Sequence, residues 1–337
     1  MFKKNSKVGD LLDVALLLLL LLTMYIFPSF ALIITILSNV LMCVITYRSN
    51  VVKSIGCIIS TYAFMVIFGF LGNAFLLSHL LDCAISTLNF LLMGFSIGIM
   101  LKLTGEISKI LISGGASYLA IIVLEIMRYN ANYETSVMDV LVNNPVKDFL
   151  KSYEQVVTAS GFDFAEMFGA NIEDVIWALQ QSLAMILPAL LILTSVAYAF
   201  IIFVISRKIL AAYKVKLYTK TFSEYQMPAA SSLALVASYL ITMFSTSTLG
   251  AACANILIIL TTLYVICGFS VVEYKFKAKM SITIFRIIIY IIVFLISMFV
   301  TAIIPFFNII TILMIIGMFD GVYDFRKLKK EEINEEE

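Results

Sequence analysis

The sequence predicts an all-α fold, a polytopic transmembrane helical bundle of about ten spans with a small extracytoplasmic helical insert. Hydrophobic residues make up 62% of the chain and charged residues 13%, whereas soluble domains carry roughly 25% charged residues. Apolar windows of about the 20 residues that cross a bilayer recur along the chain. One long polar segment, residues 129–175, interrupts them. These observations indicate a multi-pass membrane protein.

The apolar windows lie at residues 11–27, 29–46, 52–70, 73–101, 108–127, 176–206, 229–247, 251–272, 284–303 and 306–320. Pro28 and Pro305 each separate a pair of short windows, because the residue before a proline disfavours helix. For the first pair, a re-entrant pair of helices is an alternative to two crossings. Pro188 lies inside the sixth window, where a proline predicts a kink.

Loop charges predict the orientation. Residues 129–174 hold eight acidic residues against two lysines, so we expect this segment outside, since lysine and arginine are enriched in cytoplasmic loops. With ten crossings, all of the 23 basic residues except Arg128, Lys147 and Lys151 then fall in cytoplasmic segments. The sequence therefore predicts a bacterial plasma-membrane protein with both termini in the cytoplasm and residues 129–175 outside.

The same pattern predicts a division of the chain. Residues 1–128 form a first transmembrane bundle, 129–175 the acidic insert, 176–320 a second bundle and 321–337 a charged cytoplasmic tail. In the insert, apolar residues at helical spacing, broken by Pro145 and Gly161, favour two or three short helices over a disordered loop.

A basic cytoplasmic loop, residues 207–226, interrupts the second bundle. It places Ile209, Leu210, Tyr213 and Leu217 on one helical face. This pattern is typical of a helix that lies on an anionic leaflet, and a positive-inside loop with no further role explains it equally well. The lysines that would face the lipid are Lys208, Lys214, Lys216 and Lys220.

Ionisable side chains in hydrocarbon cost several kcal/mol unless they are paired or hydrated, so they mark candidate sites. The fourth window carries such residues at spacings of 3, 4 and 3, which put them on one helical stripe: His79, Asp82, Ser86 and Asn89. Glu125 and Arg128 in the fifth window pair with each other or reach this stripe. We interpret His79, Asp82, Asn89 and Glu125 as the lining of an outward-facing crevice that binds a solute or relays a proton. The alternative is a hydrated helix end whose polar groups satisfy one another.

A G-x-S-x-G pattern at Gly94, Ser96 and Gly98 matches the nucleophile elbow. That elbow requires a strand that turns into a helix, and this stretch lies within an apolar window. We therefore interpret Gly94 and Gly98 as residues that let another helix approach closely.

Other polar residues lie near the predicted cytoplasmic ends of the helices. We expect Asp320 and Asp324 to cap and hydrate a helix end beside Arg326, and Glu273 to pair with Lys277 one turn later. The chain has no zinc-protease or phosphate-loop motif, and its five cysteines stand at unrelated spacings. We expect no catalytic residue, no metal, no cofactor and no nucleic-acid partner, and therefore no enzyme.

Three segments of the second half of the chain are similar to segments of a known family: residues 222–228 (FSEYQMP), 268–275 (GFSVVEYK) and 317–327 (GMFDGVYDFRK). They resemble the YybS-like bacterial membrane proteins, a family known as a domain of unknown function. The first half of that family is distantly similar to the substrate-binding subunits of energy-coupling-factor vitamin transporters. The resemblance implies capture of a solute from outside and an energising ATPase as partner.

The function that we expect is that of a transport component in the lipid bilayer that binds a small-molecule solute. The alternative is a membrane scaffold or regulatory subunit. In that case, the acidic outer segment and the basic inner loops would bind envelope proteins, other membrane proteins or lipids.

Overall fold

The computed structural model describes residues 6–70, 77–215, 221–245, 247–280, 282–303 and 308–328, and these residues contain helices and no strand. Each of the ten apolar windows contains a helix. They are α1 (Ser6–Ile26), α2 (Ala31–Arg48), α3 (Val51–Phe70), α4 (Leu77–Leu103), α5 (Ile107–Asn132), α8 (Ile172–Ala212), α9 (Ala229–Phe244), α10 (Thr248–Lys279), α11 (Thr283–Ile303) and α12 (Ile309–Tyr323).

The helical membrane class is confirmed. Among the described residues, six helices are long and apolar enough to cross a membrane: α2, α3, α4, α5, α8 and α10. The apolar stretches of α1, α9, α11 and α12 are shorter. Crossing by these four helices stays a prediction.

The chain forms two compact units. The first comprises Met1–Ala184 and Leu190–Thr219, and the second comprises Met185–Ala189 and Lys220–Glu337. Most of α8 therefore belongs with the first unit, although the sequence analysis grouped this helix with the second bundle.

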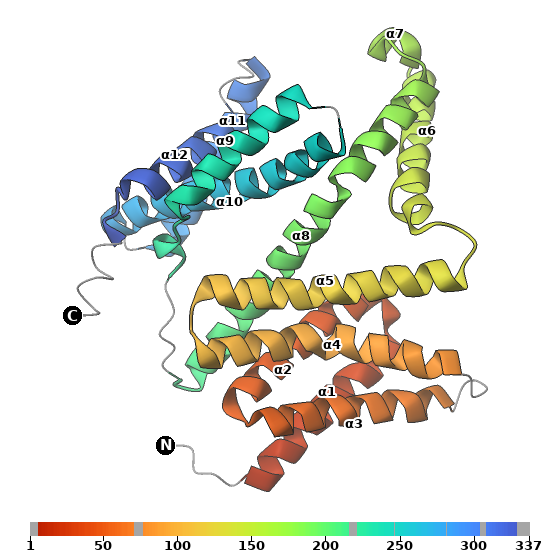
Figure 1. The fold of residues 1–337 in the computed structure, drawn as a ribbon, viewed down its shortest axis with the longest axis vertical. Helices are drawn as coiled ribbons and strands as arrows, with labels where there is room; N and C mark the ends of the chain where they lie inside the picture. The colour runs from red at the N-terminus through yellow and green to blue at the C-terminus, as the bar shows by residue number, and fades with distance from the viewer. Residues whose placement is uncertain are drawn as a thin grey trace. The chain divides into compact units, whose positions relative to one another are not determined.

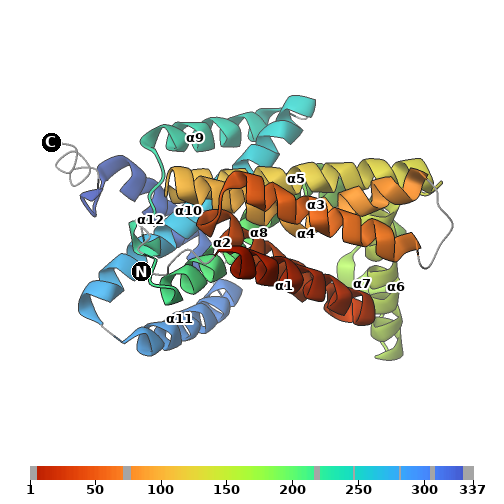
Figure 2. The ribbon, with the colours of Figure 1, turned by 90° about the horizontal axis from the view of Figure 1, so that it is seen from below.

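In the first unit, α4 packs against α2, α3 and α5 (Figures 1 and 2). One apolar cluster joins α2, α4, α5 and α8 and includes Cys43, Ile97, Ile110 and Phe203. A second cluster joins α1 to α2, α3 and α4 and includes Leu17, Met42, Met65 and Leu91. Lipid tails are as apolar as these side chains, so close packing, and not exclusion from water, holds such helices together.

Glycines allow α2 and α4 to touch. A Cβ atom added to Gly94 would lie 2.0 Å from the backbone oxygen of Asn39, and one added to Gly98 would lie 2.7 Å from Cβ of Thr46. The Asn39 amide fills the same contact: it accepts a hydrogen bond from the Gly94 N–H (2.8 Å) and donates one to the Asn89 carbonyl (3.2 Å). The backbones meet here because neither glycine has a side chain.

The polar segment between α5 and α8 is helical. It contains a π-helical turn, η2 (Asp139–Asn143), followed by α6 (Asn144–Ala159) and α7 (Phe164–Phe168). Pro145 lies in the first turn of α6, where a missing N–H costs nothing. Gly161 follows the helix with a φ of +82°, a conformation that glycine adopts readily. The preference for short helices is confirmed, and the side of the membrane stays a prediction.

In the second unit, α10 packs against α9 and α12, and the short helix η3 (Phe222–Glu224) packs on α10. A Cβ atom added to Gly268 would lie 1.9 Å from the backbone oxygen of Leu313, and one added to Gly317 would lie 2.2 Å from that of Tyr264. Two glycines thus bring the backbones of α10 and α12 into contact.

The backbone of α8 on both sides of its proline has a polar partner in this unit. Pro188 cannot donate a backbone hydrogen bond, and its ring disturbs the preceding turn. Asn255 of α10 accepts from the Ala189 N–H (2.8 Å) and donates to the Met185 carbonyl (2.8 Å). One amide thereby satisfies backbone groups on both sides of the proline.

Replacing Gly94 by alanine should lower the midpoint of thermal unfolding in detergent. The new methyl group would overlap a backbone atom that cannot rotate away, and overpacking of this kind costs about 1–3 kcal/mol. The control is Gly56→Ala in α3, because a Cβ atom there meets nothing within 4 Å. It should be neutral or slightly stabilising. Equal unfolding midpoints for the two variants would contradict the close contact between α2 and α4.

Candidate functional site

A cavity of about 440 Å³ opens in the first unit, lined by residues of α4, α5, η2 and α8. Its volume falls within the range of small-molecule sites. Asp82, Asn89 and Glu125, predicted to line one crevice, all lie in its wall. The fourth predicted residue, His79, belongs to α4, but its side chain lies outside the described part of the structure.

An arginine joins the two carboxylates of the cavity. Nη1 of Arg128 lies 2.9 Å from Oδ1 of Asp82, and Nη2 lies 2.8 Å from Oε2 of Glu125. Both pairings considered for Arg128 therefore occur together. The three side chains are 31–41% exposed, and ion pairs of this exposure contribute about 1 kcal/mol or less. The triad is thus accessible to a solute and held only weakly.

Asn132 and three tyrosines add to the polar part of the wall: Tyr118, Tyr129 and Tyr133. The rings of Tyr129 and Tyr133 stack with centroids 4.6 Å apart, and Tyr118 stacks on Tyr198 of α8 at 5.0 Å. These tyrosines were not predicted from the sequence. Tyr118, Glu125 and Tyr129 follow the spacing of one helical face of α5, and that spacing was the available signal. Tyr133 is the residue that follows the helix.

Asn89 lies two turns along α4 from Asp82, about 10 Å at the helical rise. Its backbone carbonyl accepts from Asn39. Within the described part of the chain its side-chain amide has no hydrogen-bond partner, although it lines the cavity. Ile121, also in the wall, is 1% exposed. The cavity therefore runs from a charged, partly exposed region to an apolar interior that contains one available amide.

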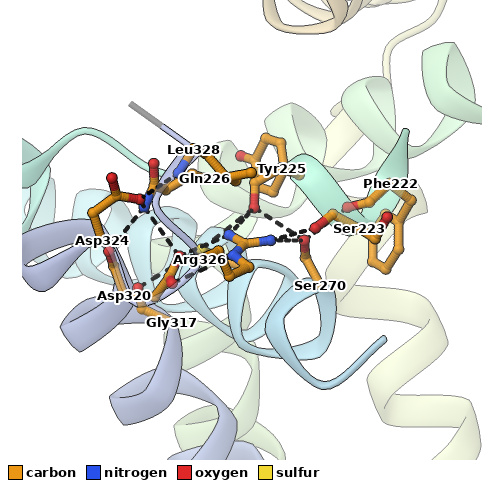
Figure 3. Close-up of polar contacts among 11 residues, drawn as sticks. Phe222, Ser223, Tyr225, Gln226, Ser270, Gly317, Asp320, Asp324, Arg326 and Leu328 are labelled. Atoms are coloured by element: carbon orange, nitrogen blue, oxygen red, sulfur yellow. Dashed lines mark hydrogen bonds and ion pairs between the residues drawn. The ribbon is translucent and has the colours of Figure 1, made fainter. Parts of the chain in front are cut away.

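A different polar cluster lies in the second unit, around Arg326 (Figure 3). Nη2 of Arg326 lies 2.7 Å from Oδ2 of Asp320, and both side chains are fully buried. Nη1 donates to the Ser223 carbonyl and to the Ser270 hydroxyl, and Nη2 donates also to the Tyr225 carbonyl. The expectation that Asp320 caps and hydrates a helix end was wrong, because the chain after α12 turns back and places Arg326 against it.

The turn after α12 depends on Asp324, which adopts a left-handed conformation with φ of 48°. Its carboxylate accepts from the Leu328 N–H and from the side chain of Gln226, which also donates to Asp320 (Figure 3). The backbone N–H of Asp324 donates to the Asp320 carbonyl, so Asp324 is the C-cap residue of α12, as expected. Burial raises the pKa of Tyr225, which follows η3 and belongs to the same polar cluster, to about 12, so this phenol is neutral at physiological pH.

The three segments that carry the resemblance meet in this cluster. Residues 222–228 supply two carbonyls and Gln226, residues 268–275 supply Ser270, and residues 317–327 supply Asp320, Asp324 and Arg326. These segments are far apart in the sequence, and the hydrogen bonds of one arginine connect them.

Residues 14–320 match the family described as "Predicted membrane protein (DUF2232)". The chain belongs to this family. The match extends from α1 into α12 and so covers the helices of both compact units. No curated protein and no solved structure matches the chain. The DUF2232 description states membrane character and no activity, so a function has to be argued from the site.

Glu273 of this DUF2232 protein has partners other than the one expected. It lies 3.0 Å from Nη1 of Arg286 and accepts a hydrogen bond from the Tyr290 hydroxyl, both from α11. The predicted pair with Lys277 was wrong. Exposed pairs one turn apart contribute only about 0.2–0.5 kcal/mol, and a largely buried arginine competes better for the carboxylate.

The basic loop of this family member is described in part. Lys208 and Lys214 are exposed, whereas Lys216 and Lys220 lie outside the described residues. Leu210, expected on a lipid-facing surface, is buried in the core of the first unit. The reason is that α8 continues as regular helix to Ala212 and keeps its packed face to the end. Lipid binding by the lysines stays a prediction.

Ser96, the central residue of the G-x-S-x-G pattern, shares a hydrogen bond of 2.5 Å with the Ser113 hydroxyl of α5. Among the described residues, no three His, Cys, Asp or Glu side chains gather closely enough to hold a metal ion.

Replacing Asp320 by asparagine should destabilise the second unit strongly. The change leaves the Arg326 guanidinium buried without a counter-charge, and loss of one partner of a buried pair costs about 3–5 kcal/mol. Unfolding in detergent, followed by heat or denaturant, measures the loss.

The matched control is Glu106→Gln, which breaks the exposed pair with Lys109 (2.7 Å, side chains 52–55% exposed). It should cost about 1 kcal/mol or less. If Asp320→Asn lowers the stability no more than this control does, the Arg326 cluster does not hold the second unit together.

Proposed function

We propose that this DUF2232 protein captures a small solute from outside the cell, without chemical conversion, in the cavity bounded by Asp82, Glu125 and Arg128. The observation that carries the proposal is that Asp82, Asn89 and Glu125, selected from the sequence as polar residues of two apolar helices, line one cavity of about 440 Å³. Sites for small molecules combine an apolar wall with a few convergent polar groups. This cavity has both, together with an unpaired amide at Asn89.

The proposal includes an orientation. Ten crossings with both termini in the cytoplasm place nearly all lysines and arginines inside, in agreement with the positive-inside rule. Residues 129–175 then lie outside the plasma membrane of a bacterial cell. Because η2 of this segment contributes Val140 and Leu141 to the wall, the cavity would open outward.

Partners follow from the same proposal. The resemblance to substrate-binding subunits supports a role as a transport component with an energising ATPase. The rival role, a scaffold or regulatory subunit, would require the cavity to be empty and envelope or signalling proteins to copurify.

Mass spectrometry of small molecules retained by the gently purified protein tests solute capture. We expect a retained molecule in the wild-type protein and its loss in Ile122→Trp, because Ile122 lines the cavity and an indole ring would fill it.

The matched control is Val123→Trp. Val123 is the neighbouring residue, is 52% exposed and is not part of the wall. Retention should persist in this variant. A molecule that both variants retain equally would lie elsewhere, and an empty wild-type protein that copurifies with envelope proteins would favour the scaffold role.

Cysteine labelling of intact cells tests the orientation. Ser152→Cys in α6 should react with a membrane-impermeant maleimide from outside, since Ser152 is exposed and belongs to the acidic segment. Asn50→Cys, between α2 and α3, should react only after the cells are opened. The parent protein is the blank, because its five cysteines are buried. The reverse pattern would place the cavity on the cytoplasmic side.

A further inference from the structure

In the described part of the cavity wall, carboxylates outnumber the one basic group and keep acceptor oxygens free, while the charge of Arg128 is matched by two carboxylates. Among its described wall residues, Asp82 and Glu125 are acidic and Arg128 is basic, so the formal charge is −1. Each terminal nitrogen of Arg128 already holds a carboxylate oxygen. The second oxygen of each carboxylate, Oδ2 of Asp82 and Oε1 of Glu125, forms no hydrogen bond or ion pair with any described residue.

This asymmetry favours one sign of charge. An anion could use Arg128 fully only by displacing both carboxylates from it. A cation with N–H groups could donate to the two free oxygens while both ion pairs remain intact. Hydrogen bonds between charged partners are stronger than those between neutral partners. The geometry therefore favours a cationic hydrogen-bond donor.

The tyrosines act in the same direction. Tyr118, Tyr129 and Tyr133 supply aromatic surface to the wall, and the faces of aromatic rings attract ammonium groups. A site that combines carboxylates with several aromatic rings therefore accepts both primary ammonium and quaternary ammonium groups.

The surroundings of the cavity are acidic. The segment 129–174 holds eight acidic residues against two lysines, and its η2 turn forms part of the wall. A surface of one sign raises the local concentration of ligands of the opposite sign and speeds their association. The segment would thus draw cations toward the cavity.

We propose that the solute bound in this cavity is a small organic cation, an amine or a quaternary ammonium compound. The inference rests on the proposed function and names the chemical class of its ligand. Asp82 and Glu125 bind the cationic group, the tyrosines cover it, and Arg128 keeps the two carboxylates in place.

Two pairs of probes of matched shape test the charge requirement with the full-length protein in detergent. Choline is compared with dimethylbutanol, its neutral carbon analogue, and diaminobutane with butanediol. Dissociation constants are measured by calorimetry, and the shift of the unfolding midpoint gives a second readout, because a ligand that binds the folded state raises it. We expect at least one cation to bind at least about tenfold more tightly than its neutral counterpart, a difference of about 1.4 kcal/mol.

Variants connect this preference to the cavity. Asp82→Asn and Glu125→Gln should each weaken binding of the cation about fivefold or more, and Ile122→Trp should abolish it. Glu106→Gln removes an acidic residue that does not line the cavity, so its affinity should equal that of the wild type.

The outcomes separate the two proposals. If a neutral or anionic molecule binds as well as the cations, or is the one retained on purification, and Ile122→Trp abolishes its binding, solute capture stands and the cation inference fails. Cation binding that survives Asp82→Asn and Glu125→Gln unchanged also overturns the inference. If no probe binds and no molecule is retained, the proposed function fails as well.

Discussion

Hydrocarbon offers no hydrogen bonds, so a polar group that a helix buries is costly unless it finds a partner inside the protein. Two asparagines of this chain meet the constraint in the same way. The amide of Asn39 bonds to two backbone groups of α4, and that of Asn255 bonds to two backbone groups beside Pro188 in α8. Each amide offers a donor and an acceptor, which matches a carbonyl and an N–H on a neighbouring helix.

The Asn39 contact also bears on the candidate site. It is possible only because Gly94 lets the backbone of α2 reach α4, and it fastens the carbonyl of Asn89. The side chain of the same residue lines the cavity. The turn of α4 that presents an amide to a solute is therefore held through its backbone by α2. Packing in this unit and the shape of the cavity depend on the same few contacts.

Local pattern predicted the helices and part of the site, and tertiary contacts decided the rest. Ten apolar windows became helices because their composition and length specify them. Spacings of three and four residues placed Asp82 and Asn89 on one face of α4, and the packing of α5 on α4 brings Glu125 to the same cavity. The burial of Asp320 and the partners of Glu273 were missed, since burial by a returning chain or a second helix leaves no signal in neighbouring residues. Leu210 was misplaced for the same reason. Ten crossings and their direction depend on a membrane and stay predictions.

The clusters around Arg326 and Arg128 differ in what their hydrogen bonds leave available. Arg326 is fully buried, and each of its three nitrogens donates to a carbonyl, a hydroxyl or Asp320. Nothing remains for a ligand, so this cluster can only stabilise the fold. Arg128 is about one third exposed and holds two carboxylates, each through one oxygen, beside an open cavity. Binding needs unused hydrogen-bonding capacity and space together, and of these two clusters only the one around Arg128 has both.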